Sequence, residues 1–230
     1  MKVKYLHTKQ IDNKAFEVLT TYNQRFGEIK EPPIPVEAII ESLLEMDFSI
    51  DDLNKNSDVP DILGATWIDN KRVIIDERLS PDEYPDKEGR YRFTGAHEIG
   101  HWVLHRHQIT ESRYRPLLDN MPAPSIVCRV SKSKEPIEWQ ADQFASYLLM
   151  PKEMVLAAWQ QRFGNLAPYV AVDEIAELTQ RFNIIDGRIP TVQVAKDIAR
   201  DVFKTSAQAM QIRLMELGLI LKDKPEPTLF

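Results

Sequence analysis

Four of the five histidines in this 230-residue chain lie between positions 97 and 107, and two of them frame the sequence HEIGH. His97 and His101 are four residues apart, so on a helix they share one face and lie about 6 Å apart along the axis. Two imidazoles placed in this way can bind one zinc ion. Glu98 lies about 100° around the helix from His97, where it can reach a water on the open side of the metal. The pattern therefore predicts a zinc site with Glu98 as general base.

The sequence offers three candidates for a third protein ligand. His105 would lie about 12 Å along the helix axis from His97, which is too far for both to bind one ion. His107 fits the spacing H-E-x-x-H-x-x-G-x-x-H, in which a glycine breaks the helix and returns the last histidine to the metal. Leu104 stands at the glycine position and resists that backbone conformation. The third candidate, Glu138, is therefore favoured over His107.

Glu138 lies in the sequence EWQADQFASYLLMP, four residues before Asp142. On a helix these two carboxylates share a face that continues as an apolar stripe, which is unusual for a simply packed helix. We expect Glu138 to be the third metal ligand. We expect Asp142 to accept a hydrogen bond from the outer N–H of a ligand histidine, which fixes the tautomer of that ring. The alternative is a solvated pair of acids at the rim of a core helix.

Apolar periodicity and turn residues predict the elements that carry these groups. The predicted helices cover residues 12–26, a segment that begins at Pro35, about 92–105, 136–149, 151–164, and three short helices within 165–221. The predicted strands are 63–67 and 72–76, joined by a hairpin turn, and 125–130. Phe182, Val202 and Leu217 are expected in the core of the last helices.

The segment 107–125 contains three prolines and shows no clear periodicity. It is expected to be a long surface loop that acts either as a lid over the substrate or as a plain connection. The strand that follows contains Cys128, the only cysteine of the chain. A strand cysteine is usually a small buried hydrophobe, although a thiolate can also bind a metal.

Together these elements predict an α+β fold with a mostly helical core and a small three-stranded sheet. A helical subdomain is expected at the C-terminus. The predicted domains are a metallopeptidase domain at 1–164 and a helix-turn-helix-like subdomain at 165–230.

Three segments of the sequence resemble the ImmA/IrrE family of regulatory metallopeptidase-like proteins. They are RFTGAHEIGHWVLH (92–105), the pair Cys128 and Arg129, and ADQFASYLLMP (141–151). The resemblance implies a zincin-like core with the small three-stranded sheet beside the HEIGH helix, and it also implies a substrate class. Members of the family are associated with cleaving or inactivating helix-turn-helix repressor proteins, so such a repressor is the expected protein partner.

The resemblance also implies roles for individual residues. His97, His101 and Glu138 correspond to zinc ligands, Glu98 corresponds to the catalytic glutamate, and Asp142 resembles the supporting acid of the gluzincin pattern. The spacing from His101 to Glu138 is longer than in the family, which places an insertion within 107–125.

The expected reaction is hydrolysis of a peptide bond. Zinc held by three protein ligands keeps a fourth position for water, and Glu98 is expected to accept a proton from that water. Glu98 would then return the proton to the leaving amine. The tetrahedral oxyanion also needs a partner. Arg129, His105, Tyr114 and Arg115 are candidates for that role, and the sequence does not select among them.

Composition limits the other classes of function. The net charge of −6 argues against a general electrostatic grip on nucleic acid or on an anionic membrane. A single cysteine suits a reducing compartment, and neither a signal peptide nor a membrane-spanning run is recognisable. A cytoplasmic protein without a membrane partner is therefore expected.

Two alternatives to the peptidase remain open at this level. Residues 191–221 resemble a helix-turn-helix, which would suit a DNA-binding regulator, but Asp197, Asp201 and Glu216 interrupt its basic residues, so DNA is an unlikely partner. The other alternative is a metal-bound anti-repressor or antitoxin that sequesters its target without cutting it. This alternative shares every motif with the peptidase.

Overall fold

The computed structural model describes residues 3–55, 57, 59–109, 116–119, 121–129, 135–183 and 188–223. Internal contacts divide the chain into two units, Met1–Leu149 and Met150–Phe230. The proposed domains at 1–164 and 165–230 remain a prediction, because contacts alone do not show which part folds independently. Within the described part of the chain, every helix is too short or too polar to span a bilayer.

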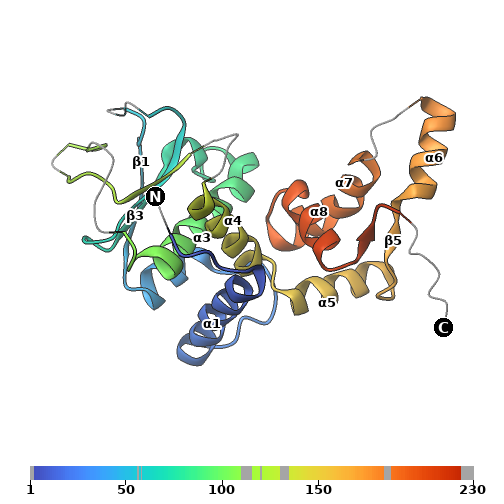
Figure 1. Ribbon diagram of the computed structural model, residues 1–230, viewed down its shortest axis with the longest axis horizontal. Helices are drawn as coiled ribbons and strands as arrows, with labels where there is room; N and C mark the ends of the chain where they lie inside the picture. The colour runs from blue at the N-terminus through green and yellow to red at the C-terminus, as the bar shows by residue number, and fades with distance from the viewer. Residues whose placement is uncertain are drawn as a thin grey trace. The chain divides into compact units, whose positions relative to one another are not determined.

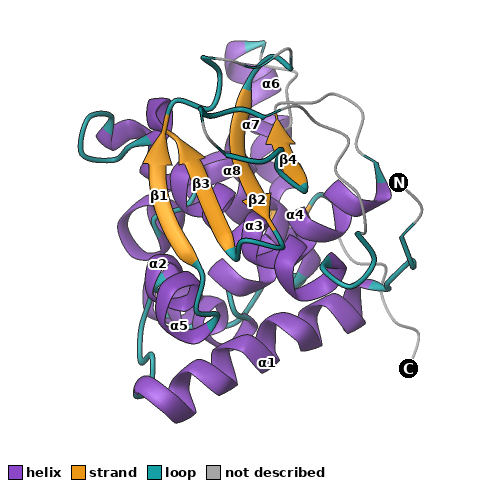
Figure 2. Ribbon diagram, turned by 90° about the vertical axis from the view of Figure 1, so that its left-hand side faces the viewer, coloured by secondary structure: helices purple, strands orange, loops and turns teal. Residues whose placement is uncertain are grey.

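The first unit is built around a mixed four-stranded sheet with the strand order β1-β3-β2-β4. The strands are β1 (Asp47–Asp51), β2 (Ile62–Trp67), β3 (Arg72–Asp76) and β4 (Ile126–Arg129). β2 pairs antiparallel with both β3 and β4, and the predicted hairpin of β2 and β3 is confirmed. Figure 2 shows the strands side by side, with helices covering the face behind them.

The prediction of three strands was wrong by one, because β1 pairs parallel with β3 at an edge of the sheet. Its sequence, DFSID, is exposed at every position except Phe48, which is half-buried. An edge strand with little burial lacks the regular apolar alternation from which strands are predicted.

Three helices of the first unit position the chemical groups. They are α1 (Thr8–Phe26), α3 (Glu88–His105) and α4 (Pro136–Leu149). α3 contacts β2 and β3 on one side and α4 on the other, and α1 packs against α4. The predicted bounds of α4 are confirmed, and the fold is α+β as predicted.

Both α1 and α3 begin about four residues earlier than the apolar periodicity indicated. The first helix was predicted to begin at residue 12, but α1 begins at Thr8. The side chain of Gln10 accepts a hydrogen bond from the backbone N–H of His7 at this end. Polar first turns carry no apolar signal, so they were read as loop. The predicted end of α1 is confirmed, since Gly27 follows the helix with φ 102°.

A buried turn of helix supports α3 from the side. α2 (Val36–Ala38) continues as a π-helix over Ile39–Leu43, and Pro35 lies just before it. The four apolar residues of the predicted helical face are all buried: Val36, Ile39, Ile40 and Leu43. A Cβ at Gly95 of α3 would lie 2.9 Å from Val36 Cγ1, so the two segments are in close contact.

The second face of the sheet carries its own apolar cluster. It includes Trp67, Ile74 and Val127 from the strands, together with Leu117, which is 2% exposed. The predicted surface loop at 107–125 therefore contributes at least one residue to the core. Residues 110–115 and 120 lie outside the described residues, so the lid prediction stays open.

The second unit is mainly helical (Figure 1). Its helices are α5 (Lys152–Phe163), α6 (Ala171–Phe182), α7 (Arg188–Asp197), which continues as a π-helix over Ile198–Phe203, and α8 (Ala207–Glu216). A short parallel pair, β5 (Tyr169–Val170) and β6 (Ile220–Leu221), was not predicted.

None of the three residues that were predicted in the core of this unit is fully buried. Phe182 is 65% exposed at the end of α6, and Val202 and Leu217 are half-buried. The fully buried positions are instead Phe203, Met210 and Leu214. Periodicity identifies an apolar face, but residues at its margin are separated from its centre only by packing against other elements.

Candidate metal centre

The HEIGH sequence lies in the buried second half of α3. His97 is 2% exposed, and Glu98 and His101 are fully buried. The rings of the two histidines lie 4.5 Å apart between centroids and are nearly perpendicular, at 83°. They therefore present their Nε2 atoms on one face of the helix, as the four-residue spacing predicted.

α4 brings Glu138 to these nitrogens from the other side. Glu138 Oε2 lies 3.3 Å from His97 Nε2, and Glu138 Oε1 lies 3.5 Å from His101 Nε2. One ligand atom from each of the three residues lies within 4.8 Å of the other two. This is the separation expected of groups that surround one cation.

The close approach of the two helices depends on a glycine. A Cβ at Gly100 would lie 3.2 Å from both the Cα and the carbonyl oxygen of Ala141, and 3.2 Å from the Cβ of Phe144. Gly100 therefore permits an approach that a side chain would prevent. Any larger residue would push α4 away and move Glu138 off the histidines.

The unsatisfied atoms of the site fit a metal ion. His97 Nε2 and His101 Nε2 are buried and have no hydrogen-bond partner in the described part of the chain. Buried ring nitrogens without partners are rare, and each such atom requires an explanation. Two imidazole nitrogens and a carboxylate are a ligand set typical of zinc with an open fourth position. A divalent cation would satisfy all three residues together.

The charge state of Glu138 also suits a ligand. Burial alone would raise the pKa of this carboxyl group, but the nearby rings of His101 and His97 outweigh burial and lower the pKa well below its usual value. Glu138 is therefore ionised throughout the neutral range and available to a cation.

Glu98 is held on the other side of α3 by the sheet. Thr66 Oγ1 donates a 2.6 Å hydrogen bond to Glu98 Oε2, while Glu98 Oε1 is buried without a partner among the described residues. Burial raises the pKa of Glu98, and this is only partly offset by His101, His97 and the Thr66 hydroxyl. A fixed carboxylate with one free oxygen and a raised pKa suits a general base.

The sequence analysis missed Thr66 and its neighbour Gly64. A Cβ at Gly64 would lie 2.7 Å from Thr94 Cγ2 and 2.9 Å from Glu98 Oε1, so only glycine leaves room for the carboxylate. The available signal was their spacing, because residues two apart on a strand face the same side. A glycine and a threonine on the inner face of an otherwise apolar strand indicate a polar neighbour.

Replacing Gly64 by alanine is expected to displace Glu98. The added methyl group overlaps two side chains, which costs about 1–3 kcal/mol of stability and moves the free oxygen from its position. We expect reduced peptidase activity with bound zinc unchanged, because Gly64 does not contact the ligand set. Chemical denaturation, metal analysis and a cleavage assay measure the three quantities. Full activity in the alanine variant would contradict this role.

Asp142 lies where the sequence analysis placed it. Its Oδ1 is 2.9 Å from His97 Nδ1. A proton on Nδ1 is donated to this carboxylate, which leaves the Nε2 lone pair directed toward Glu138 and the metal position.

Asp142→Ala is expected to weaken zinc binding by about 10–100-fold, because His97 loses the partner that fixes its tautomer. Competition with a chelator of known affinity measures the change. Glu153→Ala, which removes an exposed acid of the same charge, is the matched control and should bind zinc as the wild type does. An unchanged affinity in Asp142→Ala would show that the contact is incidental.

The other candidates for ligands are placed differently. His107 is exposed and belongs to neither of the potential metal groups found among the described residues. Cys128 is 8% exposed, and its sulfur belongs to a second such group with His97 and Glu98. His105 is fully buried, and its Nδ1 lies 3.1 Å from His101 Nδ1. Burial, together with the charge of His101, lowers the pKa of His105 to about 3, so this ring is neutral.

The oxyanion partner is still unassigned. Tyr114 and Arg115 lie outside the described residues. Arg129 is the exposed last residue of β4, and His105 is occupied by its contact with His101. The catalytic assignment of Glu98 and the metal assignments of His97, His101 and Glu138 remain predictions, although the structure brings all four residues together.

A buried pair of histidines and a glutamate, with a second glutamate alongside, is the arrangement found in metallopeptidases. The model of the peptidase M78 family, described as the IrrE N-terminal-like domain, matches residues 45–185. The chain therefore belongs to this metallopeptidase family, and the resemblance noted in the sequence is confirmed. No curated protein matches the chain.

Proposed function

We propose that this protein is a zinc-dependent endopeptidase that cuts a regulatory protein, with a helix-turn-helix repressor as its substrate class. The observation that carries the proposal is the convergence of His97, His101 and Glu138 on one point, with the free oxygen of Glu98 nearby. The family match supports a metallopeptidase. The identity of the metal and the identity of the substrate are our own inferences.

The three ligand residues would hold zinc, which when bound supplies a Lewis acid for a water and for the scissile carbonyl. Glu98 accepts the proton of that water at Oε1, since Oε2 is held by Thr66 at 2.6 Å. Glu98 then donates the proton to the nitrogen of the leaving amine. Burial of Glu98 limits the access of other water and keeps its proton affinity high.

Substrate binding is expected along β4. This strand lies at an edge of the sheet and pairs only with β2 among the described strands. An extended peptide can add to such an edge through main-chain hydrogen bonds, with its side chains alternating between the two faces. Cys128 and its neighbours on β4 would then place the peptide beside His97 and Glu98.

The substrate to test first is a helix-turn-helix repressor, chosen from the genes that adjoin the gene for this chain. Zinc-loaded protein is expected to cut it at a single region, giving two fragments that mass spectrometry identifies. A chelator should stop the cleavage, and added zinc should restore it. A repressor that is captured but stays intact would contradict the peptidase and favour the anti-repressor alternative.

A further inference from the structure

The two histidines of the proposed metal site have different supports. His97 Nδ1 faces the carboxylate of Asp142, whereas His101 Nδ1 lies 3.1 Å from Nδ1 of His105, a fully buried histidine one turn further along α3. A hydrogen bond between two ring nitrogens requires a proton on one and a lone pair on the other. The pair must therefore adopt complementary tautomers.

We propose that His105 is a positioning residue that holds His101 in the tautomer required for metal binding. The inference rests on the proposed function, in which His101 Nε2 is the atom that faces the metal beside Glu138. The lone pair of His101 is then on Nε2 and its proton is on Nδ1. His101 therefore donates to His105 Nδ1, and His105 carries its own proton on Nε2.

Gln140 of α4 continues this arrangement. Its Nε2 donates a 3.2 Å hydrogen bond to the backbone oxygen of Lys4, which fixes the amide orientation and leaves Oε1 as an acceptor. Gln140 Oε1 and His105 Nε2 are both buried, and neither has a well-formed hydrogen bond to any described residue. The Gln140 side chain raises the pKa of His105, against the larger lowering of that pKa by burial.

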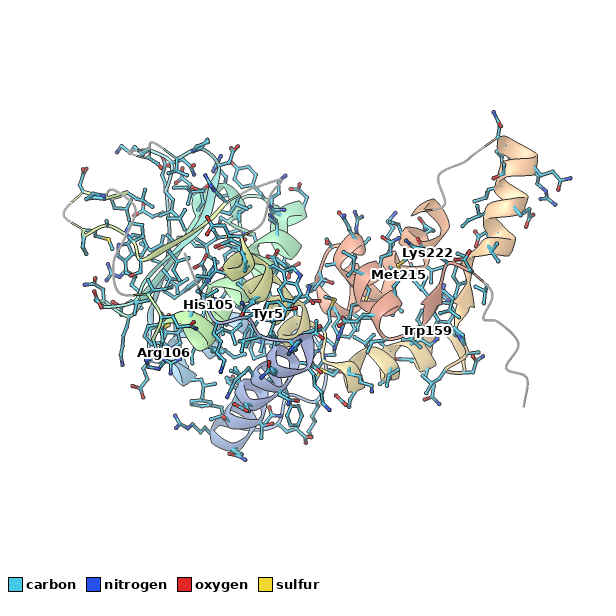
Figure 3. All side chains as sticks on the ribbon, viewed as in Figure 1. Tyr5, His105, Arg106, Trp159, Met215 and Lys222 are labelled. Carbon is cyan, nitrogen blue, oxygen red and sulfur yellow. The ribbon has the colours of Figure 1, made fainter. Side chains whose placement is uncertain are left out.

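The N-terminal segment braces Gln140 from outside. The backbone N–H of Lys4 donates a 2.8 Å hydrogen bond to Gln108 Oε1, just beyond the end of α3. The ring of Tyr5, which is labelled in Figure 3 together with His105, also contacts α4. It stacks on the ring of Trp139 with 6.0 Å between the ring centroids and an angle of 5° between the ring planes. The segment is therefore fixed to both helices that carry the ligands, beside Glu138 and Gln140.

The proposed role of His105 is to orient the ring of His101. Asp142 gives His97 a negatively charged partner at 2.9 Å, whereas His105 gives His101 a neutral acceptor at 3.1 Å. A residue that merely fills space at position 105 would leave the His101 ring free to adopt the opposite tautomer, with its lone pair directed away from the metal.

The first test measures zinc affinity by competition with a chelator, without any substrate. His105→Leu is expected to bind zinc about 10–100-fold more weakly than the wild type. His105→Asn should recover most of the affinity, because its amide oxygen can accept the proton of His101. The matched control is His107→Leu, which removes an exposed histidine close by and should bind as the wild type does. Thermal unfolding verifies that each variant is folded.

The second test reads the tautomers directly, by nitrogen-15 NMR of the histidines in metal-free protein. The expected result is a proton on Nδ1 of His101 and on Nε2 of His105. In Gln140→Leu, this tautomer preference of His105 should weaken. The NMR result in the wild type decides the question even when His105→Leu does not fold.

A proton on Nε2 of His101 would overturn the proposal. Wild-type zinc affinity in a folded His105→Leu variant would overturn it equally. These outcomes are separate from failure of the proposed function. Protein that binds zinc but cuts no peptide would refute the peptidase and leave the role of His105 intact. Protein that binds no zinc would refute the metal site. The NMR measurement would then test only the direction of the hydrogen bond between His101 and His105.

Discussion

Replacing Glu98 by glutamine is expected to lower the peptidase rate by about 10²–10⁴-fold, the range that a positioned general base contributes. Glutamine has nearly the same shape and can still accept the Thr66 hydrogen bond, which is 2.6 Å in the wild type. It cannot accept a proton from water at neutral pH. Since Glu98 is not one of the three proposed ligands, the bound zinc should remain.

Three measurements on one preparation test this prediction. Steady-state cleavage gives the rate, metal analysis gives the zinc content, and thermal unfolding shows whether the variant is folded. Glu88→Gln, at the first turn of the same helix, is the matched control and should cut at the wild-type rate. A folded, zinc-loaded Glu98→Gln variant that cuts as fast as the wild type would remove the general base from the mechanism.

Replacing Glu138 by alanine is expected to abolish stable zinc binding. The carboxylate is the one ligand that we propose on α4, and its two oxygens lie 3.3 Å and 3.5 Å from the ring nitrogens of the histidines. The loss of affinity should exceed the roughly 10–100-fold that removal of a supporting residue costs. Peptidase activity should disappear with the metal.

The Glu138→Ala variant can also be tested by measuring its free energy of unfolding with and without zinc. Zinc at about 1,000 times its Kd should raise the free energy of unfolding of the wild type by about 4 kcal/mol, because it binds only the folded chain. Glu138→Ala should show no such rise at the same zinc concentration. Glu135→Ala, which removes an exposed acid just before α4, should respond as the wild type does. A full zinc response in Glu138→Ala would exclude Glu138 as a ligand.

Much of this site could be predicted from the sequence because helical spacing fixes local geometry. The face shared by His97 and His101, and the pairing of Asp142 with a ligand histidine, both follow from four-residue intervals on helices whose existence was clear. The meeting of α3 with α4 was implied by the expectation that Glu138 joins His97 and His101 at one ion. These predictions depend only on the geometry of single helices and on which of their faces meet.

The contacts that come from the sheet could not be predicted in the same way. Thr66 and Gly64 act on Glu98 only because β2 lies against α3, and the sequence does not say which strand a helix covers. The role of His105 was also out of reach. Its distance along the helix excluded it as a ligand, and its 3.1 Å contact with His101 depends on ring orientations that spacing does not specify.

The fold also contains elements that could be predicted from the sequence and elements that could not. Elements with regular apolar periodicity, such as α4 and the hairpin of β2 and β3, were predicted closely. The exposed edge strand β1 and the polar first turns of α1 and α3 were missed, because their conformation is set by pairing and capping. Phe182 was assigned to the core because it is large and apolar, but it is 65% exposed.

The central claim is that one zinc ion is held by two nitrogens from α3 and one carboxylate from α4. A crystal structure of the zinc-loaded Glu98→Gln variant, with the metal located by anomalous scattering at the zinc edge, tests this claim directly. The predicted result is a single zinc bound to His97 Nε2, His101 Nε2 and a Glu138 oxygen at about 2.0–2.2 Å. Zinc bound elsewhere, or a Glu138 side chain turned away from the ion, would contradict it.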